Sequence, residues 1–490
     1  MLGWIRKWFR GGEGQRGTQG SYTAASMEKS DVNHYAWADG SSADVLNDPM
    51  TRKTSRDRAR YECRNNSYAG GLVESLANDL IGTGPRLQLS IPGVAREVTR
   101  EVELAFQRWS EAANYPEDLR VLHMTEVRDG EAFAILVDNP KLAESGRTAI
   151  TLDLGIYEAE QCADPWYAGW DPLYVDGIRR DKMGNPTEYT FLDAHPGGMQ
   201  SWAAVKTKKF PAASVLHWYK PIRPGQTRGI TRLAAGLPLG AQLRRYTMAT
   251  LNSAEFAASI SGVMTTNLPL ADSQIDIEAM DNVNLPKGSL LTLPNDCEAK
   301  PFDSTQPVNT YPEFKREVLN EFGRGMQAPL NVVTGSSSNY NFSQAKMDER
   351  LYFRAIRVER SRLRHRVLDP VFVAWVREAA LRGALPASLM RVFGDEPQLV
   401  PPIASWSWEW NFDGFESVDP QKDAQTDETE LRNNTNTLAA ICARKGLDWE
   451  EVLRQRAKEN ALAKELGVSA APPAPTVQQQ PQEAANGESA

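Results

Sequence analysis

The longest uninterrupted helical pattern of apolar and polar positions lies between Asn341 and Pro370, where the chain has no Gly or Pro. Five apolar residues share one narrow stripe at about 100° per residue, which predicts an amphipathic helix. Asn341 and Gln344 fit a capping box at its start, and Ser343 is an alternative cap. A helix of roughly 35 residues is about 50 Å long, which indicates a strut in a larger assembly. The stripe is Ala345, Ile356, Leu363, Val367 and Ala374; the arginines away from it are Arg350, Arg354, Arg357 and Arg364.

The segment before this helix is polar, carries no charge and has a single apolar residue, Tyr340. Such a composition predicts an exposed, flexible loop. It is either a loop that meets a partner or an ordinary surface loop. Its residues are Gly335, Ser336, Ser337, Ser338, Asn339, Tyr340 and Asn341.

The N-terminal half mixes helical and strand periods, so residues 56–224 predict an α+β domain. Gly82 and Gly84 end its first helix, and residues 183–185 (Met-Gly-Asn) make a hairpin turn. The predicted helices are 56–80, 98–109 and 119–128; the predicted strands are 132–137, 148–154, 189–192 and 215–219.

Further along, Pro238 opens a predicted helix to Ile260 that is rich in Ala and Ser. Small side chains suit close helix packing around a ring, but they also suit an ordinary core helix. Residues 262–305 predict a small α/β unit with a strand at 289–293. The alternating tryptophans of 406–412 predict a strand, and Asp419 and Asp448 cap two charged, solvated helices. Residues 470–490, rich in Ala, Pro and Gln, predict disorder.

Composition excludes several classes of function. The chain has 490 residues, with Lys+Arg 55, Asp+Glu 63 and a net charge of -8, which argues against coating DNA by bulk electrostatics. Its four cysteines are far apart, without a C-x-x-C, so reduced thiols in a cytosolic compartment are expected rather than zinc ligands. Neither a membrane span nor a signal peptide is expected. Residues 1–10 interleave Trp, Ile and Phe with Arg and Lys; we prefer a tail that docks on a neighbouring subunit or stays mobile over a membrane anchor.

The sequence matches several catalytic motifs, but each match lacks the structural context or the companion motifs that its chemistry needs. The G-x-G-x-x-G match at 12–17 follows no strand, and Ser343 and Lys346 match S-x-x-K without its companion motifs. The five histidines show no ligand spacing, and there is no phosphate-binding Gly-Lys loop. Glu126 and Asp129 lie at helical spacing and predict a solvated face. We therefore expect no enzyme, cofactor or metal, and a chain that helps to move DNA must take the energy from a partner.

The order and spacing of several short motifs, between about residue 50 and residue 466, resemble the lambda-type bacteriophage portal proteins. No single motif is specific, but the set is. The matching segments are 60–87 with Arg64-Asn-Asn66, Tyr68-Ala69 and Ile81-Gly-Thr-Gly84; Val215-Leu-His217; Arg223-Pro-Gly-Gln-Thr-Arg-Gly229; 322–340; Arg350; Leu368-Asp-Pro370; Trp375; Gly383; and Val418-Asp-Pro420 with Lys422.

The resemblance implies a portal fold: an α+β wing, a two-helix stem, a small α/β clip, a long wing helix and a C-terminal helical crown. The implied divisions are an N-terminal arm 1–55, wing 56–237, stem helix 238–260, clip 261–306, second stem helix 307–326, tunnel loop region 327–342, long helix and wing completion 343–418, crown 419–469 and tail 470–490.

By the same resemblance, the chain forms a ring, a dodecamer in the capsid, at one capsid vertex, after assembly in the host cytoplasm. Double-stranded DNA passes through the ring during packaging and ejection. The implied partners are the terminase large subunit, major capsid and scaffolding proteins, and a head–tail adaptor, with no membrane. Residues 335–341 line the tunnel, and Asp296, Glu298 and Lys300 contact terminase or adaptor. The alternatives are a head–tail connector, which is usually smaller, and a DNA-processing enzyme, which would need an acidic metal cluster.

Overall fold

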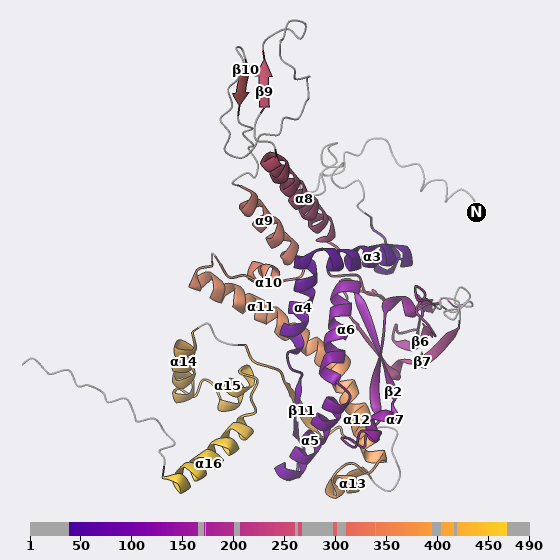
Figure 1. The fold of residues 1–490 in the computed structure, drawn as a ribbon. Helices are drawn as coiled ribbons and strands as arrows, with labels where there is room; N and C mark the ends of the chain where they lie inside the picture. Colours follow the sequence, from indigo (N-terminus) through magenta and orange to yellow (C-terminus); the bar gives the residue numbers. More distant parts are fainter. Residues whose placement is uncertain are drawn as a thin grey trace, which may run out of the picture.

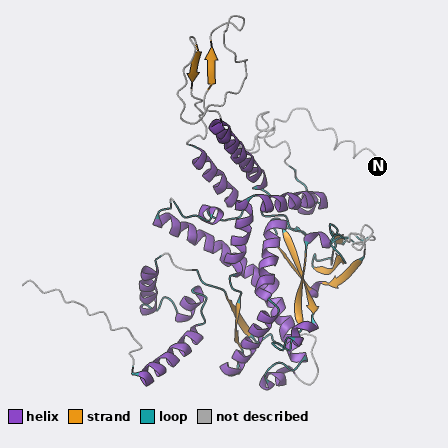
Figure 2. Ribbon diagram, viewed as in Figure 1, coloured by secondary structure: helices purple, strands orange, loops and turns teal. Residues whose placement is uncertain are grey.

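The computed structural model describes residues 39–164, 171, 173–199, 206–259, 263–266, 297–300, 310–338, 340–393, 403–415 and 419–467. Helices and sheets are mixed, which confirms the α+β class (Figure 2). A helical pair, α8 and α9, projects from one end of the body, and the antiparallel strand pair β9–β10 lies beyond it (Figure 1). Helices α14, α15 and α16 lie toward the other end (Figure 1).

The first helical segment is broken where the sequence predicts one helix over 56–80. Helix α3 spans Pro49–Asn65 and α4 spans Ser67–Ile81. Asn66 between them has extended backbone angles, and its side chain accepts a hydrogen bond from the Tyr68 amide at 3.1 Å. A cap in mid-sequence therefore starts a new helix, although the apolar spacing continues through it. The expected glycine end is confirmed, since Gly82 follows α4 with φ 60°.

Two antiparallel sheets form the β part of the body. One has the order β3 (Leu152–Tyr157), β2 (Glu131–Asp138), β8 (Val215–Tyr219). The other has the order β4 (Tyr174–Val175), β5 (Ile178–Arg180), β6 (Pro186–Leu192), β7 (Thr207–Pro211). The predicted hairpin turn joins β5 to β6, with Gly184 at φ 88°. Helices α5 (Arg96–Ala112) and α6 (Tyr115–Asp129) correspond to the predicted 98–109 and 119–128.

A third sheet pairs segments from the two ends of the chain. Strand β11, Ser407–Asn411, confirms the tryptophan pattern, and Trp406 and Trp410 are buried. Its partner is β1, Arg86–Ser90, in antiparallel register, and the sequence did not predict this strand. The short regular elements elsewhere in the described chain are α2 (Ala43–Leu46), α7 (Pro140–Glu144), η3 (Ala159–Gln161) and η6 (Ala212–Ser214).

The predicted long helix exists but contains a wider turn. It runs as α11 (Phe342–Leu363), a π-helical turn η7 (Arg364–Leu368) and α12 (Asp369–Leu381). Asn341 caps it, accepting from the Gln344 amide at 2.8 Å, while Ser343 lies within the first turn. Beside the π turn, the carboxylate of Asp369 accepts from the indoles of both Trp408 and Trp410, at 2.8 and 2.9 Å. Contacts with β11 thus accompany the change in pitch.

Helix α8 (Leu237–Ser259) and helix α9 (Tyr311–Arg324) lie side by side. Thr247 and Tyr311 join them through hydroxyls 3.0 Å apart, and the rings of Tyr246 and Phe314 stand 5.2 Å apart. Helix α10 (Leu330–Thr334) follows α9. Strands β9 (Val263–Thr266) and β10 (Cys297–Lys300) pair antiparallel. The predicted strand at 289–293 lies outside the described residues.

The C-terminal helices are α13 (Ala387–Phe393), α14 (Pro420–Arg432), α15 (Leu438–Arg444) and α16 (Trp449–Leu466). Asp419 and Asp448 cap α14 and α16 as predicted, and neither helix has a buried residue. Helix α15 was not predicted. Arg96 of α5 holds α16 through Glu450 at 2.7 Å. The limits of arm, wing, stem, clip and crown remain predictions.

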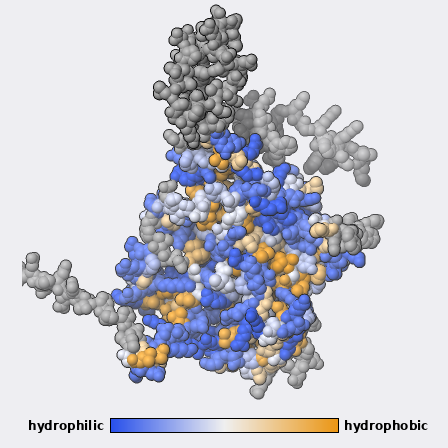
Figure 3. Space-filling view, in the orientation of Figure 1, coloured by the Kyte–Doolittle hydropathy of each residue, from blue (hydrophilic) through white to orange (hydrophobic). Residues whose placement is uncertain are grey.

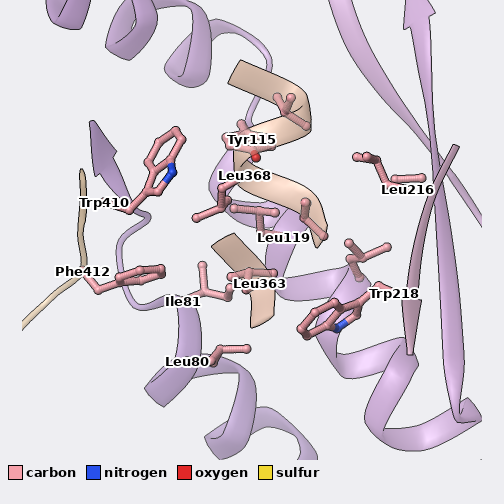
Figure 4. Close-up of a cluster of buried hydrophobic side chains, with 14 of the residues drawn as sticks. Leu80, Ile81, Tyr115, Leu119, Leu216, Trp218, Leu363, Leu368, Trp410 and Phe412 are labelled. Atoms are coloured by element: carbon pink, nitrogen blue, oxygen red, sulfur yellow. The ribbon is translucent and has the colours of Figure 1, made fainter. Parts of the chain in front are cut away.

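The main core gathers apolar side chains from helices that are distant in sequence. Figure 4 shows Ile81, Leu119, Leu363, Leu368 and Trp410 converging from α4, α6, the α11–η7 helix and β11. A smaller cluster around Phe133, Tyr189 and Phe191 lies between the two larger sheets. The sequence pattern is confirmed, since Ile356 and Leu363 of α11 and Val367 of η7 are all buried.

Candidate functional site: the loop between α10 and α11 and its supports

The loop at 335–341 joins two helices at the edge of the body. Gly335 ends α10 in the left-handed region, φ 64° and ψ 22°, and residues 335–338 are exposed. The hydroxyls of Ser336 and Ser338 are 2.7 Å apart, and the Tyr340 amide donates to the Ser337 carbonyl at 3.2 Å. Asn339 lies outside the described residues. The described part is therefore an uncharged turn held by its own hydrogen bonds.

Tyr340 fastens the loop to the first turns of α11. Its ring is half-buried, and burial together with the nearby Asp348 carboxylate raises the pKa of the phenol. One residue later, Asn341 caps α11. The far end of the loop is thus fixed by a phenol and a helix cap, while residues 335–338 face solvent.

A tight turn holds α10 against the end of α9. The Ala328 amide donates to the Gly323 carbonyl at 3.1 Å, and Gln327 takes a positive φ of 60°. Gly323 is buried there, and a Cβ on it would collide with Val333 and lie 2.8 Å from the Ala328 carbonyl oxygen. The close approach of α10 to α9 requires glycine at this position.

The middle of α11 is anchored on the end of α4. Tyr352 donates to the Asp79 carboxylate at 2.6 Å. Arg360 donates to the carbonyls of Leu80 at 3.1 Å and Asp79 at 3.0 Å, which the last turn of α4 leaves without helical partners. Burial lowers the pKa of Arg360 to about 10, so it remains charged at neutral pH.

A buried ion cluster ties α11 to α6 and to the segment that leads into α8. The Arg232 guanidinium lies 2.7 Å from Glu126 and 3.1 Å from Glu359, and all three side chains are at most 9% exposed. Arg362 and Lys220 also approach Glu359, at 2.8 and 3.5 Å. Although burial opposes it, this positive surrounding lowers the pKa of Glu359 to about 2.

The prediction that Glu126 and Asp129 form a solvated face is wrong. Both are buried: Glu126 pairs with Arg232, and Asp129 pairs with Arg60 at 2.6 Å and Arg128 at 2.8 Å. Helical spacing identifies a shared face, but only the tertiary structure brings cations to it. Burial raises the pKa of Glu126, whereas the two arginines hold that of Asp129 below its ordinary value against the burial.

A second buried cluster holds the segment 223–229 in place. Arg228 and the Glu131 carboxylate are 2.7 Å apart, both almost fully buried, and His217 lies 3.0 Å from Glu131. The Glu131 pKa is held far below its usual range by Arg228 and His217, against its burial. Gly229 approaches the backbone of Gly130 so closely that a Cβ has no room. These residues join α6, β2 and β8, and their positions far apart in sequence hid the cluster from sequence analysis.

The segments predicted to contact a motor are only partly described. Glu298 and Lys300 lie on β10, paired in register with Thr265 and Val263 of β9. Asp296 lies outside the described residues. Their role stays a prediction, as does the tunnel role of residues 335–341.

Among the described residues, one group has metal-ligand spacing: Glu158, Glu160 and His195, whose ligand atoms lie within 4.8 Å of one another. The sequence showed no such spacing. Arg60 already contacts Glu158 at 3.1 Å and Glu160 at 2.8 Å, and Arg56 contacts Glu160 at 2.7 Å. Because Arg60 pairs with both carboxylates and Arg56 pairs with Glu160 as well, the arrangement fits an ion-pair cluster rather than a cation site. Within the described helices, none has the length and apolar character needed to cross a membrane.

Comparison with known proteins identifies relatives. Residues 33–360 match the family described as phage portal protein, lambda family. A probable portal protein of Halomonas phage phiHAP-1 is 24% identical over 444 residues, which covers 85% of this chain and 82% of the relative. Portal protein B of Escherichia phage lambda is 21% identical over 465 residues, covering 86% of each. A chain from the neck of an empty gene transfer agent particle aligns with a TM-score of 0.48 and 13% identity, over 79% of this chain and 92% of that one.

Proposed function

The chain belongs to the lambda family of phage portal proteins, and from this premise we propose that it forms a closed ring at one capsid vertex through which DNA enters and leaves. The proposed ring is a dodecamer that assembles in the host cytoplasm, nucleates the shell with the major capsid and scaffolding proteins, and later carries a head–tail adaptor. Its role is structural: the terminase large subunit supplies the energy for packaging.

The observation that carries the DNA-conduit role is the loop at 335–341. It is uncharged, residues 335–338 are exposed, and it lies at the N-terminal end of α11, whose middle is fixed in the body by Tyr352, Arg360 and Glu359. A rigid support positions a loop accurately, while the loop itself has few interactions with which to grip a polyanion. Many Lys or Arg contacts would hold the duplex and make its affinity strongly salt-dependent. An uncharged lining therefore suits sliding.

Ring formation is tested directly on the purified protein. We expect light scattering to give a mass many times 54.4 kDa and negative-stain images to show rings with a central hole. A protein that stays monomeric at micromolar concentration would contradict the proposal. Metal-dependent cleavage of DNA by that monomer would support an enzyme instead.

The motor contact is proposed at the β9–β10 end, which stands farthest from the body (Figure 1). Reversing the charges of Asp296, Glu298 and Lys300 together should weaken terminase binding in a pull-down while rings remain intact in negative stain. If the rings fall apart, this strand pair is an assembly element, and the proposed contact is wrong.

A further inference from the structure

Helix α11 is apolar on two opposite faces. Tyr352, Ile356 and Leu363 are buried in the body. On the other side, Met347, Leu351 and Val358 are exposed by 60%, 59% and 58%. At about 100° per residue, these three share about 40° of arc, roughly opposite Ile356. A helix that only covered its own core would have a polar outer face, so this exposed apolar stripe calls for an occupant.

A row of positive charge borders the exposed stripe. Arg350, Arg354 and Arg357 are exposed and lie on its flank, over about 10 Å of helix. In the part of the chain that the structure describes, none of the three forms a salt bridge. Like charges at spacings of three and four residues disfavour a helix slightly, so a facing row of acids would relieve this repulsion.

Helix α9 exposes a complementary row. Glu313, Glu317 and Glu321 are all exposed, four residues apart, and span about 12 Å. Among the described residues, Glu317 alone of the three forms a salt bridge, with Arg316 at 3.3 Å, and that pair is largely exposed. Phe314, 51% exposed, borders this acidic row and extends it with an apolar edge.

The two faces are similar in length and complementary in charge. Each combines three like charges with exposed apolar surface, and the signs are opposite. Figure 3 shows orange, apolar patches that interrupt a mostly hydrophilic surface. A basic face cannot pair with its own copy in a second molecule, because its three arginines would oppose three arginines. The occupant must therefore present a different face.

We propose that the exposed face of α11 in one copy packs against the Glu313–Glu317–Glu321 face of α9 in the next copy. Two different faces that meet head to tail generate a ring or an open filament, and closure gives a ring. The inference rests on the proposed ring and specifies the pair of helices in contact. It also places an intersubunit contact on the helix that carries the 335–341 loop, so neighbouring loops would be held at a fixed spacing.

A charge swap tests the contact. Arg354→Glu alone and Glu317→Arg alone should each raise the concentration at which rings dissociate by about tenfold or more, measured by mass photometry, because like charges then face each other. The double variant should recover most of that loss. The matched control is Arg108→Glu with Glu101→Arg on α5, a helix remote from α9 and from the start of α11 (Figure 1). Both residues are exposed, and the two changes should leave ring dissociation unchanged.

A cross-link gives a second, independent readout. With Leu351→Cys and Phe314→Cys in one chain, mild oxidation should produce a ladder of covalent multimers, whereas either single variant should give no ladder beyond that of the natural cysteines. Two results would overturn the inference without refuting the proposed ring. In one, the single swaps leave ring dissociation unchanged. In the other, the single swaps weaken the ring and the double variant does not rescue it. A natural protein that forms no ring at all refutes the proposed function instead.

Discussion

The buried cluster around Arg232 provides the sharpest test of how α11 is held. In Arg232→Met, the side chain keeps its bulk but loses the guanidinium that pairs with Glu126 and Glu359. Glu359 keeps Arg362 and Lys220, so its charge remains compensated. Glu126 keeps only His123, at 3.7 Å, and burial lowers the pKa of that imidazole to about 3, so it is neutral. The damage therefore falls mainly on Glu126.

Removing one partner of a buried ion pair costs about 3–5 kcal/mol, because a charge is left without compensation. We expect Arg232→Met to lower the free energy of unfolding by this amount. Adding Glu126→Gln removes the stranded charge, so the double variant should recover about 1–3 kcal/mol relative to the sum of the single changes. Exposed Arg58→Met on α3 is the control and should change stability by less than about 0.5 kcal/mol.

The loss of unfolding free energy in Arg232→Met should also depend on pH, in a direction that the pKa of Glu126 determines. In Arg232→Met, the pKa of Glu126, already raised in the natural protein, rises further above its unfolded value. A carboxylic acid whose pKa is raised on folding loses stability as the pH climbs from its unfolded pKa toward the raised folded value, so the deficit in unfolding free energy should shrink as the pH falls toward the ordinary Glu pKa of 4.5.

The assay is hydrogen exchange of α6 and α11, because a protein of several regions does not unfold in one step. An opening free energy within about 1 kcal/mol of the natural protein's, or a deficit that grows as the pH falls, would refute the reasoning.

Three further predictions concern the same region. Replacing residues 335–341 by a short Gly linker should leave folding and rings nearly unchanged, since little apolar area is lost, but particles should package DNA incompletely or fail to retain it. Ser337→Lys should slow packaging, and the effect should shrink as the salt concentration rises. Normal packaging in both variants would show that the loop does not line the DNA path. Gly323→Ala should destabilise by about 1–3 kcal/mol, because the Cβ meets Val333, whereas Gly71→Ala on α4, with nothing within 4 Å, should be neutral or stabilise by up to about 1 kcal/mol in thermal unfolding. Glu359→Gln should make the free energy of unfolding less dependent on pH in acid. A carboxylate with its pKa lowered to about 2 stabilises the fold above about pH 4.5 and loses that contribution as the pH falls through 2. An unchanged acid transition would show that this carboxylate does not control it.

Local signals in the sequence determined several elements of this protein. The caps at Asn341, Asp419 and Asp448, the buried stripe of α11 and the alternation of β11 all follow from neighbours within a few residues. Caps and amphipathic periods depend on such neighbours alone. The exposed loop at 335–338 was visible for the same reason, because a run of Gly and Ser has neither apolar nor charged side chains to bury.

The tertiary structure decided the rest. The cap at Asn66 divided a continuous apolar pattern into two helices, and the turn at 364–368 widened beside the tryptophans of β11. Glu126 and Asp129 are buried because their cations come from afar: Arg232 is 106 residues from Glu126, and Arg60 is 69 from Asp129. Whether a charge on a helix meets water or a buried partner depends on which segments fold against it, and the helical period carries no information about that.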